Sequence, residues 1–435
     1  MSKFSSFEPT KVFFDPNIPQ ILPHENMYKI QIGSTLFKIS GASLSSDGPS
    51  YFTNFFTKLE ANAIESGSGS EESSGTCQTI LFIDRSAEIF ELIYQHLQGY
   101  YIDIKDEVQY TMLIADSLYY NLPRLRKILR DSEYYYTKIG DVSFKLPKSL
   151  FDRDGDRHNY FYITTDTLYV NVERVIISRK LIRPPPHSYS FVPRSPHLFK
   201  QIFQLLGGAK QTMDDNLRQS LIKECRYYRL QNLEQQLVKC ALLADPVTGR
   251  DEIWIKLDDI SKKGLLLEHP DEKQADNVDP VNKKRKTEYV FPQPYIKYKR
   301  PYIDQQTRHL VVQLDGPDTY MNMGGGCMHM TGKTKTKLEL ILGNLFEKHT
   351  GTSIKRSVKD IDGVSTLILP VIFEEPCPII LDGRRIELAK ILMEKLYVQK
   401  GLFLIYINCA ELVFSPVKLE LLNNFGEVRY MEPFL

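Results

Sequence analysis

An internal repeat is the feature that most constrains how this chain can fold. Residues 82–99 read as the end of a strand followed by the start of an amphipathic helix. Residues 191–208 repeat the pattern, and Arg85 matches Arg194 at a spacing of 109 residues. Self-similarity at a fixed spacing indicates one structural unit used twice. We therefore expect two related modules in the amino-terminal part of the chain.

Each copy carries the signals of a helix that begins just after a serine. Ser86 and Ser195 can accept a hydrogen bond from a backbone N–H of the first turn, as an N-cap does. Pro196 occupies the position in a first turn where proline is best tolerated. His96 is expected on the exposed face of the first of these helices, as a surface residue. The apolar face of that helix is formed by Ile89, Phe90, Ile93 and Leu97.

Further pieces of the two copies correspond in order. Residues 28–32 and 35–39 alternate in polarity and predict two strands joined by a turn at Gly33. Residues 139–146 repeat residues 32–39 at a spacing of 107, and residues 225–233 echo the segment from Tyr119 to Leu125. Between them, residues 161–179 read as a strand-like run. We interpret residues 136–241 as a diverged second copy.

The pieces of the first copy resemble a known domain. Four motifs follow one another, namely 32–37, 51–56, 82–90 and 115–125. They are similar to the V-G-G-x-x-F, Y-F-x-x-M-F, F-I-D-R and A-x-Y-Y-x-L-x-x-L motifs of BTB/POZ domains of the potassium-channel tetramerisation type. Ser34 replaces the second glycine, a low-complexity loop is inserted before Phe82, and the zinc-binding His/Cys set of some channel members is absent. The residues that carry the resemblance are Gly33, Phe37, Tyr51, Phe52, Phe56, Asp84, Arg85, Phe90, Tyr119 and Tyr120.

The expected fold class is α+β. Its predicted parts are a disordered arm, a BTB/POZ domain, a diverged BTB-like domain, a charged linker and a strand-rich mixed C-terminal domain of unknown type. They span residues 1–26, 27–131, 136–241, 258–288 and 289–435, in that order.

Composition restricts the class of protein and its location. A net charge of +1 argues against a chain devoted as a whole to nucleic acid or membrane. The six scattered cysteines form no C-x-x-C pair, which favours reduced thiols in the nucleus or the cytoplasm. No apolar run approaches the roughly 20 residues of a membrane helix. The amino terminus has the pattern of neither a secretory signal nor a mitochondrial presequence.

A run of basic residues predicts a nuclear-import signal. Lys283, Lys284, Arg285 and Lys286 lie in the charged linker and are interpreted as a candidate nuclear-import signal, although a solvated charge run is the alternative. The segment up to residue 302 interleaves Lys297, Lys299 and Arg300 with Tyr295, Tyr298 and Tyr302. It could touch nucleic acid, a minority hypothesis because no reading helix is evident.

A glycine-rich segment, residues 324–334, invites comparison with a phosphate-binding loop. Such a loop needs four residues between its first glycine and Gly-Lys-[Ser/Thr]. The required position holds Cys327, so a simple glycine loop is the preferred interpretation. No catalytic constellation, metal site or cofactor site can be nominated.

The resemblance implies a non-enzymatic interaction protein. Members of the family self-associate through the BTB core, several recruit cullin-type ubiquitin ligases, and others act as scaffolds or transcriptional co-regulators. We expect protein partners, self-association and a nuclear or cytoplasmic location. Two alternatives remain: a nuclear regulator that contacts DNA or chromatin through residues 283–302, and an enzyme whose active site lies in residues 289–435.

Overall fold

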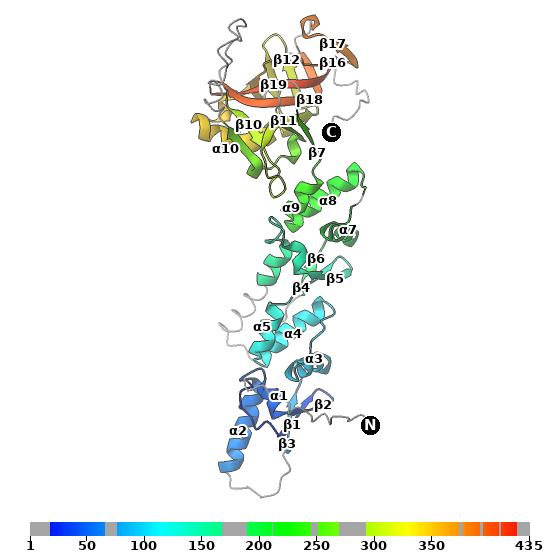
Figure 1. The fold of residues 1–435 in the computed structure, drawn as a ribbon, viewed down its shortest axis with the longest axis vertical. Coiled ribbons are helices and arrows are strands. Elements are labelled where there is room, and N and C mark those ends of the chain that lie inside the picture. The colour runs from blue at the N-terminus through cyan, green and yellow to red at the C-terminus, as the bar shows by residue number, and fades with distance from the viewer. Residues whose placement is uncertain are drawn as a thin grey trace, which may run out of the picture. The chain divides into compact units, whose positions relative to one another are not determined.

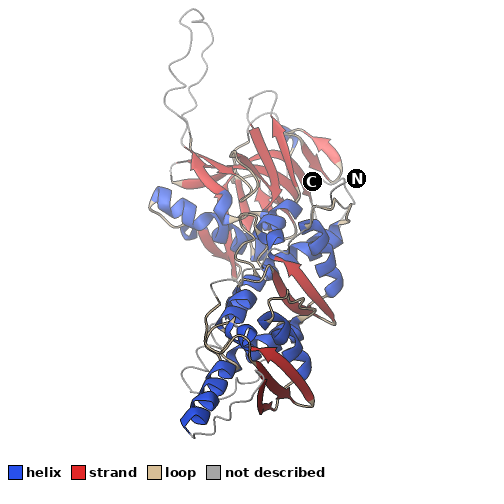
Figure 2. Cartoon of the chain, turned by 60° about the horizontal axis from the view of Figure 1, so that its bottom comes forward, coloured by secondary structure: helices blue, strands red, loops and turns tan. Residues whose placement is uncertain are grey.

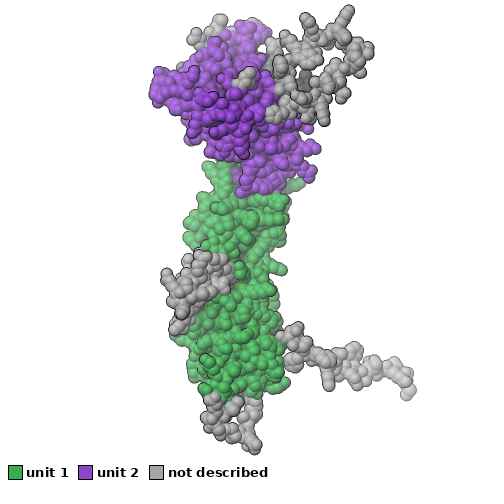
Figure 3. Space-filling model, turned by 90° about the vertical axis from the view of Figure 1, so that its left-hand side faces the viewer, with its two compact units in different colours: residues 1–230 green, residues 231–435 purple. Residues whose placement is uncertain are grey.

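The computed structural model describes residues 18–65, 76–167, 189–210, 212–244, 251–268, 293–373, 377–391, 395–408 and 410–423. The chain divides into two compact units, residues 1–230 and 231–435, which Figure 3 colours separately. Helices and strands occur in both units, and mixed sheets combine parallel and antiparallel pairs (Figure 2). The predicted α+β class is confirmed.

The first repeat is a three-stranded sheet with helices on one side. Strand β1 lies in the middle, antiparallel to β2 and parallel to β3. The helices follow in chain order from blue, α1 and α2, to cyan, α4 and α5, in Figure 1. The elements are β1 (Met27–Ile32), β2 (Thr35–Ser40), α1 (Gly41–Ser45), α2 (Tyr51–Glu65), β3 (Thr76–Ile83), α3 (Ala87–Leu97), α4 (Glu107–Tyr119) and α5 (Pro123–Arg130).

The second repeat reproduces this arrangement. Strand β4 lies between β5, antiparallel to it, and β6, parallel to it, so the strand order β5-β4-β6 matches β2-β1-β3. The elements are β4 (Tyr134–Ile139), β5 (Val142–Pro147), η1 (Lys148–Phe151), β6 (Phe191–Val192), α7 (Pro196–Leu206), α8 (Asp215–Tyr228) and α9 (Gln231–Leu237). Helix α9 falls in the second unit, where Gln235 accepts a hydrogen bond from the Tyr298 hydroxyl at 3.3 Å.

Local chemistry explains why the two repeats fold alike. The Ser86 hydroxyl accepts from the backbone N–H of Ile89, and the Ser195 hydroxyl accepts from Leu198, each at 3.4 Å. Gly33 and Gly140 both have positive φ, 55° and 58°, in the turn between the first two strands of each sheet. Both predicted N-caps are confirmed.

One predicted strand is wrong. Residues 160–167, at the start of the run 161–179, are helical, and residues 168–179 lie outside the described residues. The Asn159 side chain caps this helix by accepting from the Tyr162 N–H at 3.0 Å. The hydroxyls of Thr164 and Thr167 donate to carbonyls one turn back, so the polar groups of both β-branched residues are satisfied within the helix.

The second unit is built on one large mixed sheet. The long strand β18 pairs with β10, β11, β12 and β19. It therefore connects the strands β12 to β15 on one side of the sheet with β7, β8, β10 and β11 on the other. The strands are β7 (Cys240–Ala244), β8 (Asp251–Lys256), β9 (Leu265–Glu268), β10 (Tyr295–Tyr298), β11 (Arg308–Asp315), β12 (Thr319–Asn322), β13 (Cys327–Met330), β14 (Val358–Ile361), β15 (Val364–Pro370), β16 (Ile379–Leu381), β17 (Arg384–Ile386), β18 (Lys395–Asn408) and β19 (Glu411–Leu422). The helical elements are η2 (Leu257–Asp259), η3 (Lys262–Gly264), α10 (Gly332–Thr350), η5 (Ile354–Ser357) and η6 (Leu388–Lys390).

Three of the expected domain limits do not coincide with the ends of the observed elements. The chain is described from Ile18, and Leu22, within the predicted arm, is buried in the core of the first repeat. Strands β7 and β8 join the sheet of the second unit, ahead of the predicted start at 289. Within the predicted linker, β9 pairs with β10.

Candidate interaction surface

The outward side of the sheet β2-β1-β3 is the candidate interaction surface. Strand β1 buries Tyr28, Ile30 and Ile32, because side chains alternate between the two faces of a strand. Its other residues point away from the core, together with their cross-strand neighbours on β2 and β3. This outer face comprises Met27, Lys29, Gln31, Leu36, Lys38, Ile80 and Phe82.

Two large apolar side chains stand on this face. Gln31 pairs with Leu36 on one side and with Phe82 on the other, so the three form one row across the sheet. Phe82 is 67% exposed and Leu36 is 46% exposed. Exposed aromatic and aliphatic side chains grouped on one face mark an interaction site more often than scattered ones do.

The matching face of the second repeat is covered within the chain. Tyr136, the counterpart of Lys29, stacks on Tyr110 of α4 with ring centroids 4.8 Å apart. The Ser143 hydroxyl donates to Glu107 at 3.2 Å, also on α4. The sheet of the second repeat therefore packs against the helical end of the first repeat, head to tail.

An ion pair closes this junction between the repeats. The Lys145 ammonium group lies 2.8 Å from the Asp103 carboxylate, just before α4. This hydrogen bond lowers the pKa of Asp103 and raises the pKa of Lys145. Lys38 is the counterpart of Lys145 on the outer face, at a spacing of 107. Among the described residues, no ion-pair partner is found for Lys38 or for its cross-strand neighbour Lys29.

The motif residues that carry the resemblance are mostly structural. Gly33 forms the turn between β1 and β2, and its backbone N–H donates to the Ile83 carbonyl at 3.0 Å. Asp84 is exposed and Tyr51 is partly exposed, beside Tyr119. The remaining aromatic residues of the motifs are buried in the core: Phe37, Phe52, Phe56, Phe90 and Tyr120.

Arg85 heads a cluster that both repeats possess. It pairs with Asp116, and its guanidinium lies 4.0 Å from the ring centroid of Tyr119. Burial raises the pKa of Asp116, although the charge of Arg85 opposes that shift. In the second repeat, Arg194 lies 3.5 Å from the Glu224 carboxylate and 4.1 Å from the Tyr227 ring centroid. Each arginine lies just after a strand, β3 or β6, and holds its end against the second helix that follows, α4 or α8, which is a positioning role.

The surface position predicted for His96 is wrong. His96 is buried, and its Nε2 lies 2.6 Å from the Asp47 carboxylate. Asp47 also accepts from the backbone N–H groups of Arg124 and Leu125, at 2.6 and 3.0 Å. Asp47 thus caps α5 from a distant loop. No local pattern around Asp47 indicates this contact, because its partners lie 49 to 78 residues away.

The predicted import signal, Lys283 to Lys286, lies outside the described residues. Of the basic residues that follow it, Lys297 pairs with Glu268, and Arg300 makes several hydrogen bonds to Asp304. Tyr298 is fully buried. These contacts leave fewer basic side chains of the segment available to a nucleic acid. Nucleic-acid binding by this segment stays an untested hypothesis.

The glycine-rich segment has no phosphate-loop geometry. Gly324 to Gly326 form the turn between the paired strands β12 and β13, and α10 begins only at Gly332. The Asp318 carboxylate accepts from the Lys333 N–H at 3.0 Å and so occupies the start of that helix. A bound phosphate would compete there with an existing carboxylate.

A Cys–His contact in the second unit does not have the charge state of a nucleophilic pair. The Cys327 sulfur lies 3.4 Å from Nε2 of His329, whose Nδ1 lies 3.1 Å from the Tyr320 hydroxyl. Burial raises the pKa of Cys327; burial and nearby lysines lower the pKa of His329. Both shifts favour the neutral thiol and the neutral imidazole, whereas an activated cysteine is a thiolate.

Two absences hold for the described part of the chain. No helix there combines the length and the apolarity that crossing a membrane requires. Nor do three or more His, Cys, Asp or Glu side chains gather there in a way that could hold a metal ion.

Comparison with known proteins places the chain among yeast relatives. A family model described as the YLR108C C-terminal domain matches residues 250–400. The chain is 48% identical over 359 residues to "Uncharacterized protein YDR132C" of Saccharomyces cerevisiae, and this match covers 76% of this chain and 72% of that protein. It is 40% identical over 329 residues to "BTB/POZ domain-containing protein YLR108C" of the same yeast, which covers 68% of this chain and 64% of that protein. No solved structure matches the chain significantly.

The identity to YDR132C and the share of that protein that the match covers show that the two proteins are related. The name of YLR108C agrees with the BTB/POZ-like motifs of the first repeat. The chain therefore belongs to the family of the yeast protein YDR132C, and it shares with YLR108C the C-terminal domain named after that protein.

Proposed function

We propose that the chain is a non-enzymatic interaction scaffold or adaptor that self-associates through the outer face of its first sheet. One observation carries this proposal: the matching face of the second repeat is docked on a helical surface, whereas no described residue covers Leu36 and Phe82 on the outer face. The name of the yeast relative YLR108C supports the same class, because BTB/POZ domains bind proteins. The interpretation of the second repeat as a diverged BTB domain belongs to this proposal.

The chemistry of the outer face restricts its partner. Lys29 and Lys38 are cross-strand neighbours, so a twofold contact between two outer faces would bring four ammonium groups together. Like charges that face each other are unfavourable. A helical surface that carries carboxylates suits the outer face better, by analogy with the surface of the first repeat that receives Lys145 and that the second repeat already covers. We therefore expect association to weaken as salt is added.

The proposal is tested by recovering a tagged copy from its own cells, with mass spectrometry of whatever accompanies it. The intact chain is compared with Phe82→Glu and with the matched control Val364→Glu, which changes an exposed strand residue of the second unit. We expect untagged copies with the intact chain and the control, and their loss with Phe82→Glu. Equal recovery from all three would contradict the outer face as the binding surface.

Two further parts of this proposal are untested. They are binding to a cullin-type ubiquitin ligase and a location in the nucleus. In the same experiment, recovery of a cullin with its RING partner would support the ligase-adaptor role. Recovery of chromatin proteins instead would favour the nuclear regulator.

A further inference from the structure

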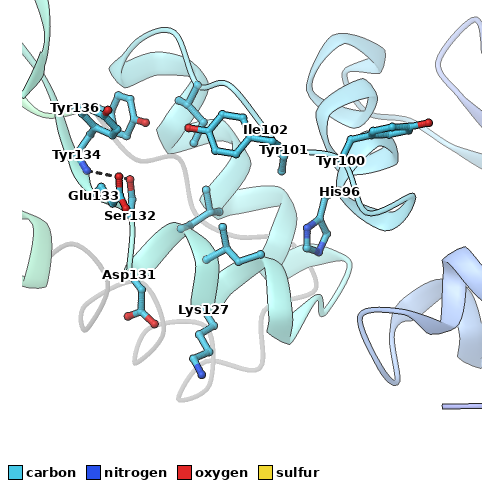
Figure 4. Close-up of a pocket in the computed structure, with 13 residues that line it drawn as sticks. His96, Tyr100, Tyr101, Ile102, Lys127, Asp131, Ser132, Glu133, Tyr134 and Tyr136 are labelled. Carbon is cyan, nitrogen blue, oxygen red and sulfur yellow. Dashed lines mark hydrogen bonds between the residues drawn. The ribbon is translucent and has the colours of Figure 1, made fainter. Parts of the chain in front are cut away.

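A pocket opens at the junction of the two repeats, away from the outer face. It has a volume of about 440 Å³, within the range of pockets that bind small ligands. Figure 4 shows Tyr134 and Tyr136 of β4 across the pocket from Tyr100 and His96. Ile104 and Leu129 add apolar lining, and the charged lining consists of two carboxylates, Asp131 and Glu133, and one ammonium group, Lys127.

The rim of this pocket is unusually apolar for a surface in water. Tyr101 is 80% exposed and Ile128 is 47% exposed, and Tyr100 is exposed as well. Tyrosine-rich pockets with a few polar groups are typical centres of protein-binding surfaces. The lining therefore suits a segment that brings aromatic rings and a cation.

The amino-terminal segment of this chain has that chemistry. Residues 1–17 contain four phenylalanines, two of which are adjacent, Phe13 and Phe14, and Lys11 precedes them by two residues. Segments that remain solvated are poor in aromatic residues. An apolar surface that covered these rings would remove their hydrophobic area from water.

The segment is attached close enough to reach the pocket. Its described continuation is held at Leu22, whose N–H donates to the Ser45 hydroxyl at 3.2 Å. The neighbouring Ser46 hydroxyl donates to the Leu97 carbonyl at 3.0 Å, and Leu97 adjoins His96 of the pocket. Phe14 lies eight residues before Leu22, and eight extended residues span about 27 Å.

We propose that the amino-terminal segment of the same chain binds in the junction pocket, with Phe13 and Phe14 against its tyrosines and Lys11 near Asp131 and Glu133. The pocket is then a peptide-binding site for adjacent aromatic residues with a basic neighbour. The tethered segment occupies it in competition with similar segments of other proteins. This inference does not depend on self-association through the outer face.

The test uses a chain that lacks residues 1–16, which keeps Leu22, beside the intact chain. A fluorescent synthetic peptide of residues 1–17 serves as the probe, and binding is followed by anisotropy. We expect saturable binding to the shortened chain and at least tenfold weaker binding to the intact chain. The reason is that the tethered copy competes at an effective concentration in the millimolar range. Absence of binding to the shortened chain would overturn the proposal.

Variants assign the binding to the pocket. In the shortened chain, Ile128→Glu and Tyr101→Glu are expected to weaken peptide binding at least tenfold, whereas Leu340→Glu, an exposed position on α10, leaves it unchanged. A peptide with Phe13→Ser and Phe14→Ser should bind at least tenfold less well. In the intact chain, amide exchange of residues 100–104 should be slower than in the shortened chain. Binding that ignores the two pocket variants, or equal exchange in both chains, would contradict the proposal.

Discussion

At the scale of single residues, Asp47 makes more of the stabilising contacts of the first repeat than its position in a loop suggests. Its carboxylate receives His96 and two backbone N–H groups at the start of α5. The residue before that helix, Leu122, supplies no side-chain cap. Asp47 therefore holds α1, α3 and α5 together through one buried group.

Replacing this carboxylate should be costly. Asp47→Ala leaves a buried imidazole and two buried N–H groups without their acceptor, and such losses typically cost about 3 kcal/mol. We expect the midpoint of urea unfolding of the first unit to fall accordingly. Asp84→Ala, at an exposed position, should change it by less than about 0.5 kcal/mol. A similar effect of both variants would show that the Asp47 contacts do not stabilise the fold.

Glu420 gives a prediction that depends on pH. It is buried on β19, and burial raises its pKa although Lys400 and Lys418 oppose that shift. The folded state therefore holds the proton more tightly than the unfolded state does. The stability of the chain falls as pH rises above the ordinary value of 4.5, up to the folded-state pKa. Glu420→Gln should raise the melting temperature at pH 7, and calorimetry should find no difference at pH 4. A variant that is less stable at pH 7 would contradict this account.

At the scale of elements, the sequence predicts best where local chemistry decides the structure. The hairpin around Gly33 and the helices after Ser86 and Ser195 follow from alternation and capping, and the structure has them as β1, β2, α3 and α7. The helix at 160–167 is not evident from the strand-like run that begins at 161, because the Asn159 cap and the threonine hydroxyl bonds that favour it appear only in the structure. Pairings such as β8 with β11 could not be predicted, because nothing local specifies a partner more than 50 residues away.

The two serine caps should contribute equally. Ser86→Ala and Ser195→Ala each remove one acceptor from a first turn, which typically costs about 1 kcal/mol. Native-state hydrogen exchange should show faster exchange in the first turn of α3 or of α7, according to the variant. Unchanged exchange in the mutated helix would mean that the cap is dispensable there.

At the scale of the whole molecule, the two repeats form one unit because each supplies part of the other's packing. Tyr136 belongs to the second repeat by sequence, yet its ring is part of the core of the first. The junction therefore covers the sheet of the second repeat within the same chain. On the outer face of the first sheet, Leu36 and Phe82 are exposed in the part of the chain that the structure describes.

Removing this shared ring should loosen both repeats together. Tyr136→Ala deletes a buried aromatic side chain, a change that typically costs about 3 to 5 kcal/mol. We expect amide exchange to quicken in α4 of the first repeat and in β5 of the second by similar factors. Faster exchange confined to β5 would show that the repeats unfold independently.

Sedimentation of the purified intact chain over a range of concentrations tests the central claim most directly. If the outer face binds a carboxylate-bearing surface of another copy, the mass should rise with concentration and the assembly should weaken with added salt. Phe82→Glu should remain a monomer with an unchanged melting temperature, while Val364→Glu should assemble like the intact chain. An intact chain that stays monomeric at every concentration, or a Phe82→Glu chain that assembles normally, would contradict self-association through this face.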